Sequence, residues 1–582
     1  MKFRLLSLPF FTASIGLIFL ISSCIPGQSP EVIPKTAAPV TPINPPTLIN
    51  IPTQTATSTP TSTPTVTLSP ALSRTSYISP NGSDTNGGDS LLSPWKTFAL
   101  AIPNLQPGDT LIVMNGTYEN KTTGLPNIDC SNSEMAHNGT SSLPITIKAQ
   151  DERQALLKSD GTTAAFYMTY CSYWNIVGLS GSSTDLSSAN GGNSNSIFQI
   201  GYSTDLVLKR LLSAYTNRYF NNHTYEIAYS SRILVEESEA YYFHRHGFSF
   251  YQSKNITARR NYANPREYAD LPGGHESLNP TGGDDAYSLY YTSDSIIENS
   301  IVQGNSQGFK IHGGPNFDGT PGGQNNKVLG SIFFGGPTAD YGGKIETRMI
   351  DNVIWATKNN VLINVLFYTN SSPGIFLEST VNATLENVTF YDMGADGIQV
   401  KEGDDSNPWC PHIPEGCGFT LLNSIVYNSA KYNISVRDNI EWAIDYSNIS
   451  TSGFGDFRAY SEAIDDASDH VQHSLSVAPT KMDPKNGFTP VYIPEGSNMK
   501  GVGLNGADIG ATILYRYENG TLTQDPLWDP GTGAFPCGGI LSGINDRVGS
   551  SCFDIHTQLN INPQTLPLNY GNITGTASNT NK

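Results

Sequence analysis

The chain has 582 residues and a formal net charge of -18. An acidic chain of this kind excludes nucleic acid as the expected partner, because phosphate binding needs a surface rich in lysine and arginine. Charged residues make up only 14% of the sequence, compared with roughly 25% in ordinary domains. Glycine, asparagine, serine, threonine and tyrosine replace them, which favours many short strands joined by turns over helices.

The first 23 residues have the features of an export signal. Lys2 and Arg4 give it a positive start, and an apolar run follows that is too short for a membrane span of the mature protein. The segment Leu20–Cys24 resembles the bacterial lipoprotein cleavage box, so Cys24 would become the lipidated first residue. We therefore expect a protein anchored by lipid on the extracellular face of the cell membrane; an ordinary secretory signal is the alternative.

Residues 24–75 are rich in proline, threonine and serine and carry almost no charge, which predicts a disordered or extended linker. Apart from Cys24 the chain has six cysteines, and an exported chain can keep disulfides. Six cysteines allow 15 connectivities. Neighbours in the sequence give three plausible pairs: Cys130 with Cys171, Cys410 with Cys417, and Cys537 with Cys552.

The predicted folded domain spans residues 76–511. Near its start, a short amphipathic run ends at Leu105, Pro107-Gly108-Asp109-Thr110 follows, and Gly116-Thr117-Tyr118 comes next. This block resembles the opening of right-handed parallel β-helix proteins of the pectate-lyase-like superfamily. The resemblance implies a short helix that caps the end of the coil and a first strand that begins near Thr110.

One unit recurs between residues 164 and 449. The step from Asn364 to Asn387 is 23 residues, and so is the step from Gly374 to Gly397. A period of this length with alternating apolar residues predicts an all-β chain folded as a parallel β-helix, a solenoid, and the resemblance implies that its coil is right-handed. The recurring asparagines are expected to be structural, with side chains that hydrogen-bond along the coil, and glycosylation is the alternative. They are Asn299, Asn364, Asn387 and Asn423.

The predicted strands at residues 284–290 and 307–312 have the same phase. Phe309 and Ile311 would face the core, and Lys310 and His312 would face outward. Stacking the coils by this phase gives two outward columns: Ser249, Ser288, Lys310, Lys344, Phe376 and Gln399, and Tyr251, Tyr290, His312, Glu346, Glu378 and Lys401. Long loops at residues 264–283 and 313–326 flank them, which favours a site over a plain solvated sheet face.

The pair Asp284-Asp285, followed by Gly308-Phe309-Lys310-Ile311, resembles the family-nine polysaccharide lyases of the pectate lyase L type. The resemblance implies that Asp284 and Asp285 bind calcium and that Lys310 is the base in β-elimination on an acidic, uronate-containing polysaccharide. His312, Lys344 and Tyr290 would then contact the substrate. A hard cation neutralises the uronate carboxylate and acidifies the neighbouring proton.

The chain departs from this family pattern at several positions. Ser288 and His246 stand where further calcium carboxylates are expected, and only the insertion before Asp284 offers replacements: Glu267, Asp270 and Glu276. The tripeptide Arg245-His246-Gly247 is expected to form a turn. Calcium is therefore an expectation that rests on two matched acids.

Two other functions stay open. Polygalacturonase-type glycoside hydrolases share the coil, and Asp284, Asp285, His312-Gly313 and Lys344 follow their order, but Gly343-Lys344-Ile345 replaces Arg-Ile-Lys and no Asn-Thr-Asp precedes. A non-catalytic glycan-binding surface protein is the third possibility. Residues 512–582 are expected to form an extension along the outside of the coil. We expect a monomer whose partners are an acidic polysaccharide and, through the N-terminal lipid alone, a membrane.

Overall fold

The described part of the chain covers most of the predicted folded domain. The computed structural model describes residues 73–184, 195–216, 222–265, 285–304, 307–335, 341–404, 407–437, 440–459, 467–483, 486, 491–529, 532–535, 553 and 555. The signal segment, Cys24, most of the linker, Asp284, Cys537 and Cys552 lie outside these residues.

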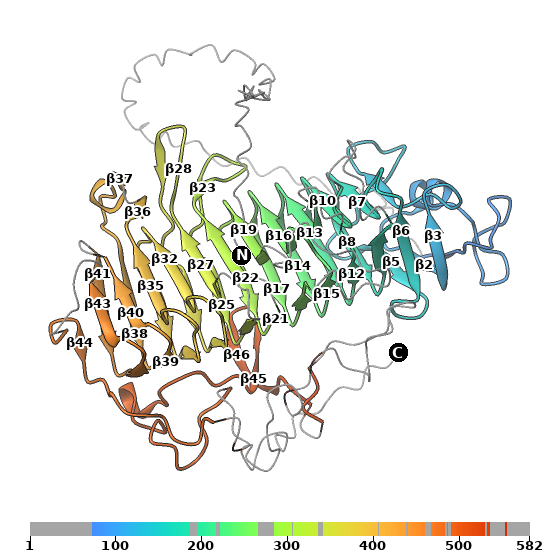
Figure 1. The fold of residues 1–582 in the computed structure, drawn as a ribbon. Coiled ribbons are helices and arrows are strands. Elements are labelled where there is room, and N and C mark those ends of the chain that lie inside the picture. The colour runs from blue at the N-terminus through green and yellow to red at the C-terminus, as the bar shows by residue number, and fades with distance from the viewer. Residues whose placement is uncertain are drawn as a thin grey trace, which may run out of the picture. The chain divides into compact units, whose positions relative to one another are not determined.

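Three long parallel sheets form the fold, and they confirm the predicted parallel β-helix (Figure 1). Each turn of the chain adds one strand to each sheet. Sheet A consists of β1 (Thr75–Ile78), β2 (Thr110–Val113), β5 (Ile145–Ala149), β8 (Ser172–Val177), β11 (Thr204–Lys209), β14 (Ser231–Glu236), β17 (Lys254–Arg259), β20 (Ile296–Glu298), β25 (Lys327–Leu329), β30 (Val361–Ile363), β33 (Ala383–Glu386), β38 (Gly418–Leu422), β41 (Glu441–Asp445) and β44 (Val471–Gln472).

Sheet B follows sheet A in each turn. It consists of β3 (Gly116–Glu119), β6 (Ala155–Ser159), β9 (Ser180–Ser183), β12 (Leu212–Ala214), β15 (Glu239–Tyr241), β18 (Tyr262–Asn264), β21 (Ile301–Gly304), β26 (Ile332–Gly335), β31 (Leu366–Tyr368), β34 (Thr389–Tyr391), β39 (Ile425–Ser429) and β42 (Asn448–Ser452).

Sheet C carries the predicted site. It consists of β4 (Asn127–Asp129), β7 (Phe166–Thr169), β10 (Phe198–Gly201), β13 (His223–Ala228), β16 (His246–Tyr251), β19 (Asp285–Tyr290), β22 (Gln307–His312), β27 (Gly343–Glu346), β32 (Ile375–Glu378), β35 (Ile398–Lys401), β40 (Tyr432–Val436) and β43 (Gly455–Ala459).

Four small antiparallel pairs stand outside the coil. They are β23 (Gly314–Pro315) with β24 (Pro321–Gly322), β28 (Arg348–Ile350) with β29 (Val353–Trp355), β36 (Gly403–Asp404) with β37 (Asn407–Pro408), and β45 (Tyr515–Glu518) with β46 (Thr521–Pro526). The first three pairs follow sheet C strands in the chain, and in Figure 1 β23, β28, β36 and β37 rise above the upper ends of the yellow and orange strands. They therefore border one edge of the sheet beside the predicted site.

Stacked rings fill the coil beneath sheet C. Phe198, Tyr225, Phe248 and Tyr287 occupy successive strands, with ring centroids 5.3, 4.7 and 4.9 Å apart. Phe309 continues this column opposite Tyr287, and both side chains are 0% exposed. The inward phase predicted for this strand is confirmed.

The ends of the coil also follow the prediction in part. α1 (Phe98–Ala101) buries Phe98 and Ala101 in the core, and the side chain of Thr97 caps it by accepting a hydrogen bond from the Leu100 amide.

Two of the three plausible disulfides, Cys130–Cys171 and Cys410–Cys417, are present. Among the described residues no helix is long and apolar enough to cross a bilayer.

The asparagine column is structural, as predicted, and it also holds the C-terminal segment. Its members adopt left-handed φ values at the turns between sheets A and B. Asn299 donates to the Gly330 carbonyl of the next coil and accepts from the Tyr517 amide. Asn364 accepts from the Thr512 amide, and Asn387 donates to the Asp508 carbonyl. These side chains therefore hold the C-terminal segment to the coil, a contact that the sequence did not predict.

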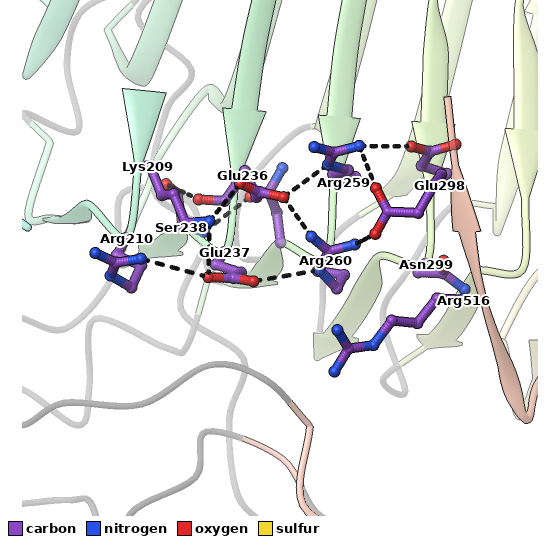
Figure 2. A network of polar contacts seen from close by, with 12 residues as sticks. Lys209, Arg210, Glu236, Glu237, Ser238, Arg259, Arg260, Glu298, Asn299 and Arg516 are labelled. Atoms are coloured by element: carbon purple, nitrogen blue, oxygen red, sulfur yellow. Dashed lines mark hydrogen bonds and ion pairs between the residues drawn. The ribbon is translucent and has the colours of Figure 1, made fainter. Parts of the chain in front are cut away.

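Ion pairs extend this attachment toward the middle of the coil. Figure 2 shows Glu236 between Lys209 and Arg259, at 2.7 Å from each. Glu518, on β45, pairs with both Arg259 and Arg260. Farther along, apolar residues of the C-terminal segment cover the outward face of sheet B. Sheet C, in contrast, is not covered by this segment in the described part of the chain.

Candidate functional site

The outward side of sheet C brings most of the predicted site residues together. β19, β22 and β27 are neighbouring strands, and adjacent parallel strands lie ~4.8 Å apart. The register pairs the members of the two predicted columns: Ser288 with Lys310 and Lys344, and Tyr290 with His312 and Glu346. The phase of the sequence was therefore sufficient to place these side chains on one surface.

The two lysines of this surface differ in their partners. The Lys344 Nζ lies 2.9 Å from Glu346 Oε2 and 2.9 Å from Glu378 Oε2. Lys310 is half-buried, and it forms no ion pair or hydrogen bond with any residue in the described ranges. Of the two, Lys310 is therefore the one whose amine no described carboxylate holds.

Burial makes His312 a neutral side chain. It is 2% exposed, and its ring centroid lies 4.0 Å from that of Tyr290. Burial, with Lys310 and Arg348 nearby, holds the pKa of His312 well below its usual value. Its Nε2 is buried and has no hydrogen-bond partner among the described residues. The predicted substrate contact of His312 stays a prediction.

Asp285 is fully buried beside these groups. Burial raises the pKa of Asp285 to about 6, although the positive charges of Lys310 and Arg245 oppose the shift. The His246 Nε2 lies 3.4 Å from Asp285 Oδ2. Neither carboxylate oxygen accepts a hydrogen bond from a described residue. Asp285 is thus a carboxyl that can carry a proton near neutral pH.

His246 belongs to a third column that alternation did not predict. The turn expected at Arg245-His246-Gly247 is instead the start of β16, where the His246 ring stacks on that of His223 at 4.6 Å. A Cβ on Gly247 would meet core side chains, so Gly247 and Phe248 both face inward. Two consecutive inward residues reverse the phase, which puts His246 on the outward side with Asp285.

Arg348 is a site residue that the sequence reading missed. Its Nη1 lies 2.7 Å from Glu346 Oε1, and its side chain is 44% exposed. Burial opposes the ionisation of Glu346, but Lys344 and the other cations outweigh it and lower the pKa of Glu346. Arg348 lies two residues after Glu346, so the same alternation could have found it.

The described residues do not by themselves fit calcium. This ion takes six to eight oxygen ligands. Near the predicted position the described residues offer the Asp285 carboxylate and the buried Ser288 hydroxyl, with two positive side chains close to Asp285. The described chain holds no group of three metal-ligating side chains. Asp284, Glu267, Asp270 and Glu276 lie outside it, so calcium stays a prediction and no step below depends on it.

Comparison with known proteins gives similar folds only. No family model and no curated protein matches the chain. Solved structures similar to it include pectate lyase Pel9A (15% identity, 64% of this chain and 79% of that chain, TM-score 0.34). They also include the A-module of Azotobacter vinelandii mannuronan C-5 epimerase AlgE6 (14%, 64% and 91%, 0.43) and a rhamnogalacturonan lyase (14%, 70% and 89%, 0.37). At these sequence identities and TM-scores the function has to be argued from the site itself. By its fold the chain is a right-handed parallel β-helix protein.

Proposed function

We propose that the protein is a polysaccharide lyase that cleaves an acidic, uronate-containing glycan by β-elimination on the outward face of sheet C. One observation carries the proposal: Lys310 has no ion-pair partner among the described residues, whereas Lys344, its neighbour in the column, is held by two carboxylates. An amine that is free of a carboxylate can take a proton from a bound sugar.

The chemistry needs a base and a means of binding the uronate carboxylate. In the proposed step Lys310 Nζ removes the proton beside this carboxylate, the electron pair forms the new double bond, and the glycosidic oxygen leaves. We assign the contact with this carboxylate to Arg348, which is partly exposed, and to the neutral His312. Lys344 instead holds Glu346 and Glu378 in position.

Product chemistry tests the proposal. Purified protein is incubated with polyuronates, with and without added calcium, and absorbance of the unsaturated sugar end is followed. We expect absorbance to rise with wild type. Lys401→Ala is the matched control, since Lys401 lies on the same sheet three strands farther on and should leave the rate unchanged. No absorbance change on any polyuronate would contradict the proposal.

A glycoside hydrolase is the second candidate, and the raised pKa of Asp285 favours it. A protonated carboxyl near neutral pH is what a general acid requires, and a second, ionised carboxylate such as Glu346 would activate water. Hydrolysis leaves a reducing end without ultraviolet absorbance. New reducing ends without an unsaturated product would therefore replace the lyase with a hydrolase.

We also propose that the protein works outside the cell, attached by lipid at Cys24. The two disulfides support an oxidising location. Cys24→Ala should leave the chain uncleaved or unanchored, which phase partition in detergent and electrophoretic mobility would show. A variant that stays in the detergent phase with normal mobility would contradict the lipid anchor.

A further inference from the structure

The outward face of sheet C continues beyond the candidate site toward the N-terminal coils, and there it loses its charges. The register carries the Lys310 column back through one residue on each strand: Ser288, Ser249, Glu226, Gln199 and Tyr167. Glu226 is the one acid among them. Burial raises its pKa, although Ser196 donates to it at 2.8 Å. Burial thus favours the protonated, uncharged form of Glu226.

A pocket lies at the far end of this column. Its volume is about 340 Å³, and its lining includes Tyr167, Asn120, Asn127, Thr163 and Asn195. Among the described residues no charged side chain lines it. Asn120 Nδ2 donates to Thr163 Oγ1 at 2.6 Å, which fixes the two side chains relative to each other. Tyr167 is 36% exposed. The pocket therefore combines an accessible aromatic ring with amide and hydroxyl groups.

A ladder of tyrosines runs along the edge of sheet C between this pocket and the candidate site. Tyr170, Tyr202 and Tyr229 stack at 5.0 and 4.8 Å, and the Tyr251 ring follows edge-on at 5.5 Å. The first three have φ values of 56°, 49° and 53°, a left-handed backbone that recurs at turns throughout the coil and here sets one tyrosine at each turn.

The ladder presents its edges outward. Tyr170 and Tyr202 are 50% and 51% exposed, and because their rings stack on one another, their edges and hydroxyls are what solvent meets. One tyrosine recurs per coil, so a polymer extended along the coil meets a new aromatic edge and hydroxyl every ~4.8 Å. Beyond Tyr251 the contacts continue through Tyr291 and Tyr290 to His312.

We propose that the pocket at Tyr167 binds an uncharged sugar unit of the glycan, and that the tyrosine ladder supports the chain between the pocket and Lys310. Five strand steps separate Tyr167 from Lys310, which corresponds to ~24 Å. An aromatic ring packs against the C–H groups of a sugar, and fixed amides hydrogen-bond its hydroxyls. A uronate carboxylate would lose hydration there without meeting a cation.

The substrate class follows from the two ends of the face. It is a glycan in which a uronate is cut at Lys310 while an esterified or neutral unit occupies the pocket. This specificity rests on the proposed function for the role of Lys310. The binding of an uncharged sugar in the pocket does not depend on it.

Binding measured by calorimetry tests the pocket without any turnover. The probes are a fully methyl-esterified galacturonan oligomer and the unesterified oligomer of the same length. We expect Tyr167→Ala to weaken binding of the esterified oligomer about tenfold and to weaken binding of the unesterified oligomer less. Tyr167→Phe should keep most of the affinity because it keeps the ring. Phe454→Ala removes an exposed aromatic outside the pocket and should change nothing.

A second variant covers the case in which Tyr167→Ala does not fold. Asn127 is exposed, so Asn127→Ala should leave the thermal unfolding temperature unchanged while it weakens binding of the esterified oligomer. Unchanged binding in the folded variants, or equal losses for both oligomers, would overturn the pocket proposal. Loss of elimination in Lys310→Ala with binding retained would leave the pocket intact, and the absence of elimination in every protein would overturn the lyase alone.

Discussion

The outward face of sheet C has two halves built on one backbone. In β7 to β16 it carries amides, hydroxyls, tyrosines and one buried acid, Glu226, whereas in β22 to β35 it carries lysines and glutamates. The interior beneath both halves is the same kind of apolar stack. Outward residues can therefore change their chemistry without changing the fold, because alternate positions of each strand pack independently. Under the two proposals above, the difference between the halves separates glycan binding from glycan cleavage.

The largest expected effect tests whether the interior really is equivalent under both halves. Phe198 and Phe309 are both 0% exposed, one beneath each half. Phe198→Ala and Phe309→Ala should each cost about 3–5 kcal/mol, because each removes a buried ring and leaves a cavity. Chemical denaturation measures the loss. A cost below ~0.5 kcal/mol for either variant would show that the half above it is not supported by a packed core.

The second-largest expected effect is a pH dependence of stability that belongs to the charged half. Because burial raises the pKa of Asp285 from 3.8 to about 6, the folded state binds this proton more tightly than the unfolded state. The stability that the proton contributes is complete below pH 4 and is lost as the pH rises through about 6. One unit of pKa shift corresponds to about 1.36 kcal/mol, so the loss in the free energy of unfolding is about 3 kcal/mol.

Asp285→Asn should remove this pH dependence and should be more stable than wild type at pH 8. Denaturation is measured in chelator, so that no cation compensates the carboxylate. Glu226→Gln makes the same acid-to-amide change in the other half, and its pH dependence of stability is measured for comparison. If wild type and Asp285→Asn show the same slope of stability between pH 4 and 6, the Asp285 carboxyl does not have the shifted pKa.

The next effect concerns catalysis and should be confined to the charged half. Lys310→Ala should lower turnover at least ~10²-fold, since general-base removal typically costs that much. Lys310→Arg should not restore the rate, because arginine stays protonated. Steady-state rates on a polyuronate measure both variants. Tyr202→Ala, in the other half, should raise KM with little effect on kcat. A kcat loss in Tyr202→Ala as large as in Lys310→Ala would remove the distinction between binding and cleavage.

The last prediction tests calcium. If Asp284 and Asp285 hold the ion, chelator should stop the wild type, and changing both to asparagine should raise the calcium concentration needed for half-maximal rate. Titration of calcium into chelated protein measures this requirement. Activity that persists in chelator and in Lys310→Ala, but is lost when either aspartate is changed, would instead make the carboxylates the acid and base of a hydrolase.

The sequence by itself predicted the solenoid and the phase of most site strands, and two of the three cysteine pairs that it made plausible are present in the structure. These features depend on local rules: apolar residues alternate along a strand, and the period repeats every coil, so alternation and period together place Lys310, His312 and Lys344 on one surface. The local rule failed where two inward residues follow each other at Gly247 and Phe248. It therefore put His246 in a turn.

Only the tertiary structure decided what these side chains can do. Burial, which depends on chain segments distant in sequence, raises the pKa of Asp285 and keeps His312 neutral. A contact within β27 and another to the next coil hold Lys344 between Glu346 and Glu378, whereas Lys310 has no such partner among the described residues. The contacts between the asparagine column and the C-terminal segment also join residues that are distant in the sequence. Desolvation and long-range pairing are properties of the assembled coil, and no local pattern encodes them.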